Sequence, residues 1–449
     1  MHPVPLALIL SLAGPLVAAD RYLLPVAAGT GDGSSWANAA AVDDLEARWA
    51  ALAPGDTLHL GSGTYAAKRT AIASGGEPGK PKTLVGHDTG GGLPVIAGTW
   101  TREKPAKGDD LFSFAKGVGH CVIRDLVIRA VRNAVVVPEG PVHDIAWSGL
   151  RISSVRSGFH LVGGGTPGQP DSGSTRLRIE NCRMEGYTKR GLRLVGGNHQ
   201  VQVVDCLADG GGKEWSVEPF PIGFMVQGDG DNSKEAGHGT PDHDITFERC
   251  EARNHYHDNG KGYWNADGFC AESRTFNLRY LACRASGNTD GGWDDKSRNP
   301  FLERCVATGN KRNFRFWTKE DGAMLKDCSC SATRTGSPRW KEPLGKRKKP
   351  PTSSALKSGC RRWRPAATGP ATSSKRAASL SPGTAISTPV IFCGTNTSAI
   401  SPSARNTSPP DPLAACRGTG FSTSGTPPPS ANSVKRYCAT ITPSAPTVT

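Results

Sequence analysis

The sequence predicts an all-β solenoid, a fold in which short strands coil and stack, and three observations predict it. Between residues 120 and 330 similar segments recur, several of them 22 to 24 residues apart. Within the segments apolar and polar residues alternate with a period of two, as in half-buried strands. A repeat of this length with Gly and Asn turns is typical of solenoids. The hydrophobic fraction of 37% excludes a multi-span membrane protein.

The N-terminus resembles an export signal. An apolar run at residues 6–12 is followed by Val17, Ala18 and Ala19 before Asp20. Small residues at such positions suit signal-peptidase cleavage, and the run is too short to span a bilayer. We therefore expect residues 1–19 to be a signal peptide and the chain to be secreted or periplasmic, without a membrane anchor.

Residues 20–119 are predicted to form an N-terminal cap and the first turns. Apolar residues at Val42, Leu45, Trp49 and Leu52 have helical spacing, with acidic residues early in the segment. This pattern predicts a helix over residues 40–53. Such a helix would cover the open end of the coil, whose strand edges would otherwise be exposed.

Residues 120–330 are predicted to form the stacked coils. One apolar position recurs in them, at Leu126, Leu150, Cys182, Cys206, Cys250, Cys283, Cys305 and Cys328. We interpret it as a column of small buried side chains, because free Cys is among the most buried residue types. Disulfides between successive members remain an alternative. Asn254, Asn288 and Asn310 follow this column and predict a second one, of turn amides that tolerate left-handed backbone and bond to the next coil.

Residues 331–449 differ from the rest of the chain. They hold 17 of the 34 prolines and 17 Lys and Arg against two acids, whereas residues 1–330 are almost neutral. Two interpretations stay open: a disordered basic tail, or a reading frame that slips near residue 330. We expect no nucleic-acid partner.

The densest group of chemically informative residues lies between residues 264 and 317. Asp267 and Asp290 are 23 residues apart, so that they can lie on neighbouring coils, and Asp294 follows on the second coil. Phe269, Trp293 and Phe314 predict an inward aromatic column. Arg315 would then point outward, one coil beyond Asp294. Carboxylates at one surface suit Ca²⁺, although Asp-Gly pairs are also ordinary turn formers.

These segments resemble the family-nine polysaccharide lyases, secreted right-handed parallel β-helix pectate lyases. The resemblance lies in Ala266-Asp267-Gly268-Phe269, the Asp290–Asp294 segment and Asn313-Phe314-Arg315. It implies a single-stranded right-handed parallel β-helix with calcium bound by Asp267, Asp290 and Asp294. Gly291 stands where the family has a further Asp, so that Asp295 could substitute only if the turn is rearranged. Arg315 stands where the family has its catalytic Lys.

The mechanism that the resemblance implies is β-elimination on an acidic, pectate-like polysaccharide by a monomeric enzyme. Arg315 would act as the base or as a clamp on a substrate carboxylate. Lys296 or Lys319 would be the alternative base, since lysine changes its pKa more readily on burial. Trp264 and His257 are candidate substrate-binding residues, or alternatively plain loop residues.

Two other functions stay open. One is a non-catalytic β-helix that binds carbohydrate or serves as a surface protein. The other is a β-helix glycoside hydrolase, for which Asp290 and Asp294 are the available pair of carboxylates.

Overall fold

A computed structural model describes residues 18–212, 218–228, 236–258, 265–317, 322–331 and 333. Residues 1–17 of the predicted signal peptide, Trp264, Lys319 and nearly all of the predicted tail lie outside the described residues. Within the described residues no helix is long and apolar enough to cross a membrane.

The described strands form three parallel sheets, called here sheets A, B and C. Sheet A contains β2 (Ala40–Ala41), β1 (Asp20–Leu24), β3 (Thr57–Leu60), β6 (Lys82–Gly86), β9 (Gly119–Arg124), β12 (His143–Ser148), β15 (Thr175–Glu180), β18 (His199–Val204), β21 (Asp242–Glu248), β24 (Thr275–Leu281), β27 (Phe301–Glu303) and β30 (Met324–Lys326). Sheet B contains β4 (Thr64–Ala66), β7 (Val95–Ala97), β10 (Val127–Arg129), β13 (Arg151–Ser153), β16 (Arg183–Glu185), β19 (Leu207–Asp209), β22 (Glu251–Arg253), β25 (Arg284–Ser286), β28 (Val306–Thr308) and β31 (Ser329–Ser331). Sheet C contains β5 (Thr70–Ile72), β8 (Phe112–Phe114), β11 (Asn133–Val137), β14 (Ser157–Val162), β17 (Arg190–Val195), β20 (Ile222–Val226), β23 (Phe269–Ala271), β26 (Gly291–Asp295) and β29 (Arg312–Phe316).

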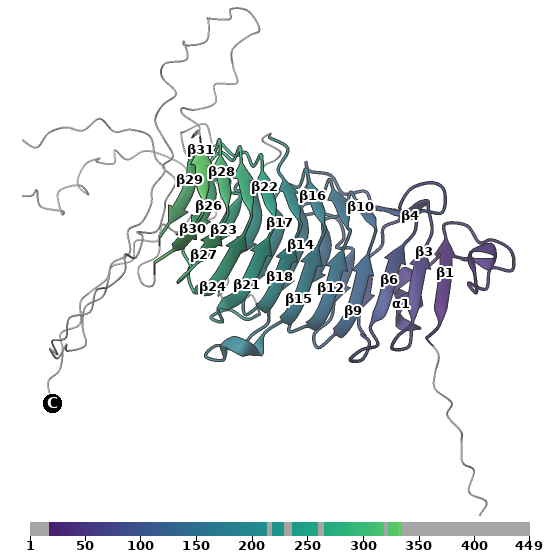
Figure 1. Cartoon of the computed structure of the whole chain (residues 1–449). Helices are drawn as coiled ribbons and strands as arrows, with labels where there is room; N and C mark the ends of the chain where they lie inside the picture. The colour runs from purple at the N-terminus through teal and green to yellow at the C-terminus, as the bar shows by residue number, and fades with distance from the viewer. Residues whose placement is uncertain are drawn as a thin grey trace, which may run out of the picture. The chain divides into compact units, whose positions relative to one another are not determined.

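The chain visits sheets A, B and C in turn, so that each coil contributes one strand to each sheet (Figure 1). Neighbouring strands within a sheet therefore belong to successive coils and pair in parallel, as β9 with β12 and β12 with β15. This arrangement confirms the predicted right-handed parallel β-helix. Residues one coil apart become neighbours about 4.8 Å apart.

The corner between sheets A and B has the same form in each of the eight described coils from β9 to β30. Two residues separate the strands, and the first has left-handed backbone, with φ from 50° to 64°. Its members are Asp125, Gly149, Asn181, Asp205, Arg249, Ala282, Arg304 and Asp327. This left-handed residue interrupts the alternation of the strand and turns the next side chain into the core.

The second corner residue is the predicted Leu and Cys column. Its members from Leu126 to Cys305 are at most 2% exposed, and Cys328 is half-buried. All six cysteines of the column are free thiols, which decides against the disulfide alternative. Several thiols donate to a carbonyl of the preceding coil, as Cys250 does to Val203 at 3.2 Å. The column is thus a packed interior seam.

The predicted asparagine column resolves into two neighbouring columns. Asn254 is left-handed (φ 59°), and Gly287 and Gly309 occupy its place in the following coils. Asn288 and Asn310 lie one residue later and are fully buried. The Asn288 amide donates to the Asn310 side-chain oxygen at 2.8 Å. The left-handed backbone predicted for this column was therefore wrong for these two residues, whereas the predicted bond to the next coil is present between their side chains.

The predicted cap helix is present but shorter than expected. It is α1 (Leu45–Ala50), because residues 40–41 form β2 instead; two single-turn 3₁₀ segments, η1 (Trp36–Asn38) and η2 (Pro170–Ser172), complete the helical elements of the described residues. Asp44 caps α1 by accepting from the Ala47 amide, and Trp49 is buried in the core. Glu46 accepts from the Ala71 amide of β5 at 2.6 Å. The helix thereby satisfies a donor on the first strand of sheet C.

Candidate functional site

The outer face of sheet C carries the predicted residues because an aromatic column fixes which side chains point inward. Phe269, Trp293 and Phe314 are in register on β23, β26 and β29. Their rings stack with centroids 4.8 and 4.9 Å apart, and all three are buried. The side chains that follow them in each strand therefore point outward. They are Cys270, Asp294 and Arg315, on three successive coils.

Asp267 and Asp290 lie beside this outward column, but they are offset from each other by one residue. Asp267 stands next to Gly291, whose amide donates to Asp267 Oδ1 at 2.6 Å. A Cβ atom at Gly291 would lie 2.8 Å from the same oxygen. The glycine thus leaves space that the Asp267 carboxyl occupies. Asp267 Oδ2 is buried without a hydrogen-bond partner.

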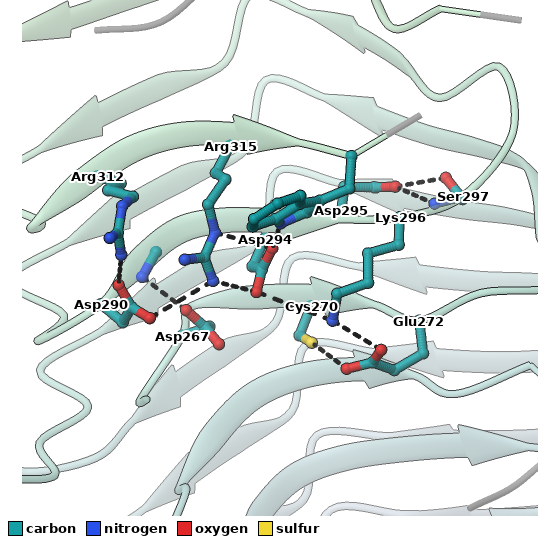
Figure 2. Close-up of polar contacts among 12 residues, drawn as sticks. Asp267, Cys270, Glu272, Asp290, Asp294, Asp295, Lys296, Ser297, Arg312 and Arg315 are labelled. Carbon is teal, nitrogen blue, oxygen red and sulfur yellow. Dashed lines mark hydrogen bonds and ion pairs between the residues drawn. The ribbon is translucent and has the colours of Figure 1, made fainter. Parts of the chain in front are cut away.

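Arg315 binds two carboxylates of the preceding coil, those of Asp290 and Asp294 (Figure 2). Its Nε donates to Asp294 Oδ1 at 3.0 Å, and its Nη2 donates to Asp294 Oδ2 and, at 3.4 Å, to Asp290 Oδ2. Arg312 donates to Asp290 Oδ1, and the Trp317 indole N–H donates to Asp294 Oδ1 at 2.7 Å. The predicted group of Asp267, Asp290, Asp294 and Arg315 is therefore brought together. Its carboxylates are nearly buried rather than solvent-facing.

Burial and neighbouring charges raise the pKa of two groups of this cluster, Asp267 and Arg315. Burial, with the negative charges of Asp294 and Asp290, raises the pKa of Asp267 to about 8. Burial lowers the pKa of Arg315, but the hydrogen bond and charge of Asp294 outweigh it and hold that pKa above its ordinary value. At neutral pH Asp267 is therefore largely protonated while Arg315 is charged.

Lys296 reaches the same cluster from the end of β26. Its Nζ lies 2.7 Å from Glu272 Oε2 and 4.0 Å from Asp294 Oδ2. Although burial lowers the pKa of Lys296, the neighbouring Cys270, Glu272 and Asp294 raise it to about 12. In this arrangement Lys296, like Arg315, is a cation and not a free base.

A cleft of about 360 Å³ lies beside the cluster on sheet C. It is lined by Arg190, Phe220, Ile222, Met225, Gln227, Asn265, Asp267, Cys270, Glu272, Ser273, Asp294 and Lys296. The predicted substrate residue His257 is 9% exposed and lies edge-on to the Phe220 ring at 5.2 Å. His257 thus stands behind a wall residue of the cleft.

Asp295 is separated from the other predicted ligands. It is fully buried on the inner side of β26 and accepts from the Tyr280 hydroxyl at 2.9 Å and from the Ser297 amide at 2.8 Å. Asp294 and Asp295 are consecutive in a strand, so their side chains point to opposite faces (Figure 2). The structure therefore does not bring Asp295 to the carboxylate cluster.

Sequence reasoning missed Arg312 and Glu272, which pair with Asp290 and Lys296. Arg312 could have been found from its spacing, because it lies 21 residues after Gly291 just as Phe314 lies 21 after Trp293. No sequence pattern marked Glu272.

The cluster offers carboxylate oxygens to a hard divalent cation. Carboxylate oxygens are the ligands that Ca²⁺ prefers, and Asp267 Oδ2 is a buried oxygen without a partner. However, Asp290 and Asp294 are held by arginines. Among the described residues, only His120, His143 and Asp144 bring three ligand atoms within 4.8 Å of one another. The three aspartates thus offer oxygen ligands of the kind that calcium prefers, but an ion using Asp290 and Asp294 would have to displace Arg312 and Arg315.

Comparisons with known proteins bear on the fold. Neither a protein-family model nor a curated protein matches the sequence. Among solved structures, pectate lyase Pel9A is 15% identical, with a TM-score of 0.52 over 70% of this chain and 76% of that chain. The Agl-KA catalytic domain is 12% identical (TM-score 0.41; 62% of this chain and 49% of that chain). Geobacillus virus E2 ORF18 is 13% identical (TM-score 0.40; 63% of this chain and 51% of that chain). The likeness to Pel9A, together with the three parallel sheets, shows that this chain has the right-handed parallel β-helix fold.

Proposed function

We propose that this chain is a secreted, calcium-dependent lyase that cleaves a uronic-acid-containing, pectate-like polysaccharide by β-elimination. The observation that carries the proposal is the convergence of Asp267, Asp290, Asp294, Arg315 and Lys296 beside one cleft. The fold adds support, since Pel9A, with which it is shared, is a pectate lyase.

The residues of the site have the charges that an acidic sugar chain needs. The Lys296 ammonium lines the cleft, and Arg315 lies against the cleft-lining Asp294. A guanidinium matches a carboxylate with two parallel hydrogen bonds, so Arg315 can clamp a substrate carboxylate. Phe220 adds an apolar wall against which a sugar ring can pack. Calcium held by Asp267, Asp290 and Asp294 would supply positive charge that makes the proton beside the substrate carboxylate more acidic.

The base must be a neutral group, so the two candidate residues are compared by how readily each loses its proton. Arg315 and Lys296 are both held protonated by the carboxylates beside them. Either residue can act as a base only after it has lost its own proton, which requires that it first separate from those carboxylates. Lysine is the easier of the two to deprotonate, so Lys296 is our preferred base and Arg315 our preferred clamp.

A panel of polyuronates, read by the ultraviolet absorbance of the unsaturated product, tests the proposal. We expect product from one polymer, its loss on chelation, and its loss in Asp294→Asn. Asp205→Asn is the matched control, because Asp205 pairs with Arg249 at the corner between sheets A and B. A panel without product, or equal activity in Asp294→Asn, contradicts the proposal.

The base itself is tested by two lysine variants. Lys296→Gln should abolish turnover while polymer binding persists. Lys326→Gln is the control, because Lys326 pairs with Glu303 on sheet A. Unchanged turnover in Lys296→Gln would rule out Lys296 as the base.

A non-catalytic carbohydrate-binding β-helix is the second candidate. Two points favour it: Gly291 stands where the family that the sequence resembles has a further Asp, and both candidate bases are charged in their ion pairs. Saturable binding of a polyuronate with neither unsaturated product nor new reducing ends would select this function. New reducing ends without ultraviolet absorbance would instead indicate a glycoside hydrolase.

The cellular location and oligomeric state belong to the same proposal. Export would be followed by cleavage before Asp20, so the N-terminal sequence of the exported protein should begin at Asp20. An N-terminus that retains residues 1–19 would argue against secretion by this route. We propose a monomer, which sedimentation analysis can check.

A further inference from the structure

Two histidines and an aspartate meet on sheet A, away from the cleft on sheet C. His120 belongs to β9, and His143 and Asp144 belong to β12, the next strand of the same sheet. One ligand atom from each residue lies within 4.8 Å of the other two. The His143 Nδ1 atom is 2.8 Å from Asp144 Oδ2, and His120 Nε2 is 4.0 Å from the same oxygen.

The backbone explains why these three side chains converge. Consecutive residues of a strand normally point to opposite faces. Asp144 has left-handed backbone (φ 52°), which interrupts the alternation and places its carboxylate against the ring of His143. His120 has the same conformation (φ 54°) one coil earlier.

Gly119 leaves the space that the His143 ring occupies. Gly119 is in register with His143, and a Cβ atom at Gly119 would lie 2.1 Å from His143 Cε1. The imidazole therefore lies over the glycine and edge-on to the ring of His120, with centroids 5.2 Å apart. A larger residue at position 119 would push the two histidines apart.

The chemistry of the group selects the class of ion. Imidazole nitrogens with a carboxylate are ligands for Zn²⁺, Ni²⁺ and Cu²⁺, whereas Ca²⁺ and Mg²⁺ prefer oxygen ligands alone. Ligand atoms that each lie about 2.0–2.2 Å from a tetrahedral zinc are roughly 3.4 Å apart. The separations of 2.8 and 4.0 Å bracket that value, so small side-chain rotations bring the atoms into place.

The surroundings leave the group accessible. The side chains of His120, His143 and Asp144 are 21%, 39% and 27% exposed, so an ion can enter from solvent and keep an open position for water. Arg176 donates to both Asp144 oxygens at 2.7 Å and holds the Asp144 pKa well below its ordinary range. The Arg176 fork fixes the carboxylate, as outer partners of metal ligands do. Outside the Arg176 fork, the Asp144 Oδ2 lone pair that faces His143 Nδ1 can be given to an ion that replaces the hydrogen between them.

We propose that His120, His143 and Asp144 bind a divalent transition-metal ion of the zinc class on the outer face of sheet A. The ion takes the place of the hydrogen between His143 Nδ1 and Asp144 Oδ2, and His120 Nε2 supplies the third ligand. This site does not depend on the proposed lyase function.

Calorimetric titration of the chelator-treated full chain with Zn²⁺, and visible spectroscopy with Co²⁺, test the proposal. We expect one saturable site whose affinity falls at least about tenfold in His143→Ala and in His120→Gln. His199→Ala is the matched control, since His199 lies two coils further in the same column and stacks on His243. Its affinity should be unchanged, and so should that of Asp294→Asn in the cleft.

The possible outcomes are separable. Unchanged melting temperatures of the metal-free variants would show that the two histidine replacements act on binding and not on folding. The proposal is overturned if the native chain has no saturable Zn²⁺ site. It is also overturned if His143→Ala and His199→Ala bind equally, or if Asp294→Asn alone abolishes binding. None of these results depends on polysaccharide cleavage.

Discussion

Replacing Arg315 with glutamine should strengthen calcium binding, because Arg315 neutralises the carboxylates that calcium would use. Its side chain is only 14% exposed and donates twice to Asp294 and once to Asp290. A cation that takes these two carboxylates must first break their bonds to Arg315. Glutamine removes the charge but keeps a side chain of similar reach.

The size of the effect follows from those contacts. Hydrogen bonds to charged groups contribute about 1.5–3 kcal/mol net, and we count the fork on Asp294 as one such unit. Removing it should therefore raise calcium affinity roughly tenfold to hundredfold. The slight exposure of Arg315 leaves little room for solvent screening.

Calcium titration calorimetry of the native chain and Arg315→Gln measures the effect. Arg312→Gln should change the affinity less, since Arg312 is 43% exposed and pairs with Asp290 but not with Asp294 among the described residues. Arg304→Gln, at an exposed pair with Glu303, should not change it. If Arg315→Gln bound calcium no better than the native chain, Arg315 would not be the group that competes for the carboxylates.

Three further predictions concern the coil itself. Trp293→Ala should lower the free energy of unfolding, measured by urea titration, by about 3–5 kcal/mol. Trp293→Phe keeps the ring stack and should lower it by less than about 1.5 kcal/mol. Equal losses in the two variants would contradict the stacking argument. Burial lowers the pKa of His255 to about 4, so the unfolded chain binds the proton first and stability should fall by up to about 3 kcal/mol between pH 6.5 and pH 4. The loss of stability should be smaller in His255→Gln than in the native chain. Equal losses in the two proteins between pH 6.5 and pH 4 would refute this assignment. The buried thiols of the interior seam should resist alkylation in the native chain and react after unfolding, as peptide mass mapping would show; they are those of Cys182, Cys206, Cys250, Cys283 and Cys305. Rapid labelling of the native chain would mean that the seam opens.

The sequence predicted the coil because the repeat length determines which residues become neighbours. Phe269, Trp293 and Phe314 were aligned correctly by their spacing, and Arg315 was thereby placed beside Asp294. Residue spacing alone does not reveal that two residues are shifted by one position in register, as Asp267 and Asp290 are. They are 23 residues apart, yet Gly291, and not Asp290, stands beside Asp267.

Other features depend on backbone conformation or on charge partners, which the repeat does not encode. Asn254 and Asn288 are similar residues at similar spacings, but only Asn254 is left-handed. Asp295 was expected to replace the missing ligand only if the turn were rearranged, and the pleat of β26 instead directs its side chain to Tyr280, away from Asp294. The pairing of Arg315 with two carboxylates also could not be predicted, because it depends on side-chain geometry across two coils.

From β9 to β30 the constant corner between sheets A and B confines variation in loop length to the other two connections, both of which adjoin sheet C. Twelve residues connect β19 to β20 and fifteen connect β22 to β23, whereas the left-handed corner takes two in each coil from β9 to β30. Phe220 and Asn265 come from these longer connections and line the cleft. Evolution can therefore exchange the walls that select a ligand without shifting the register of the coil that holds them. Grafting connections between β-helices of this type should transfer preference for a polymer while leaving the stack beneath intact.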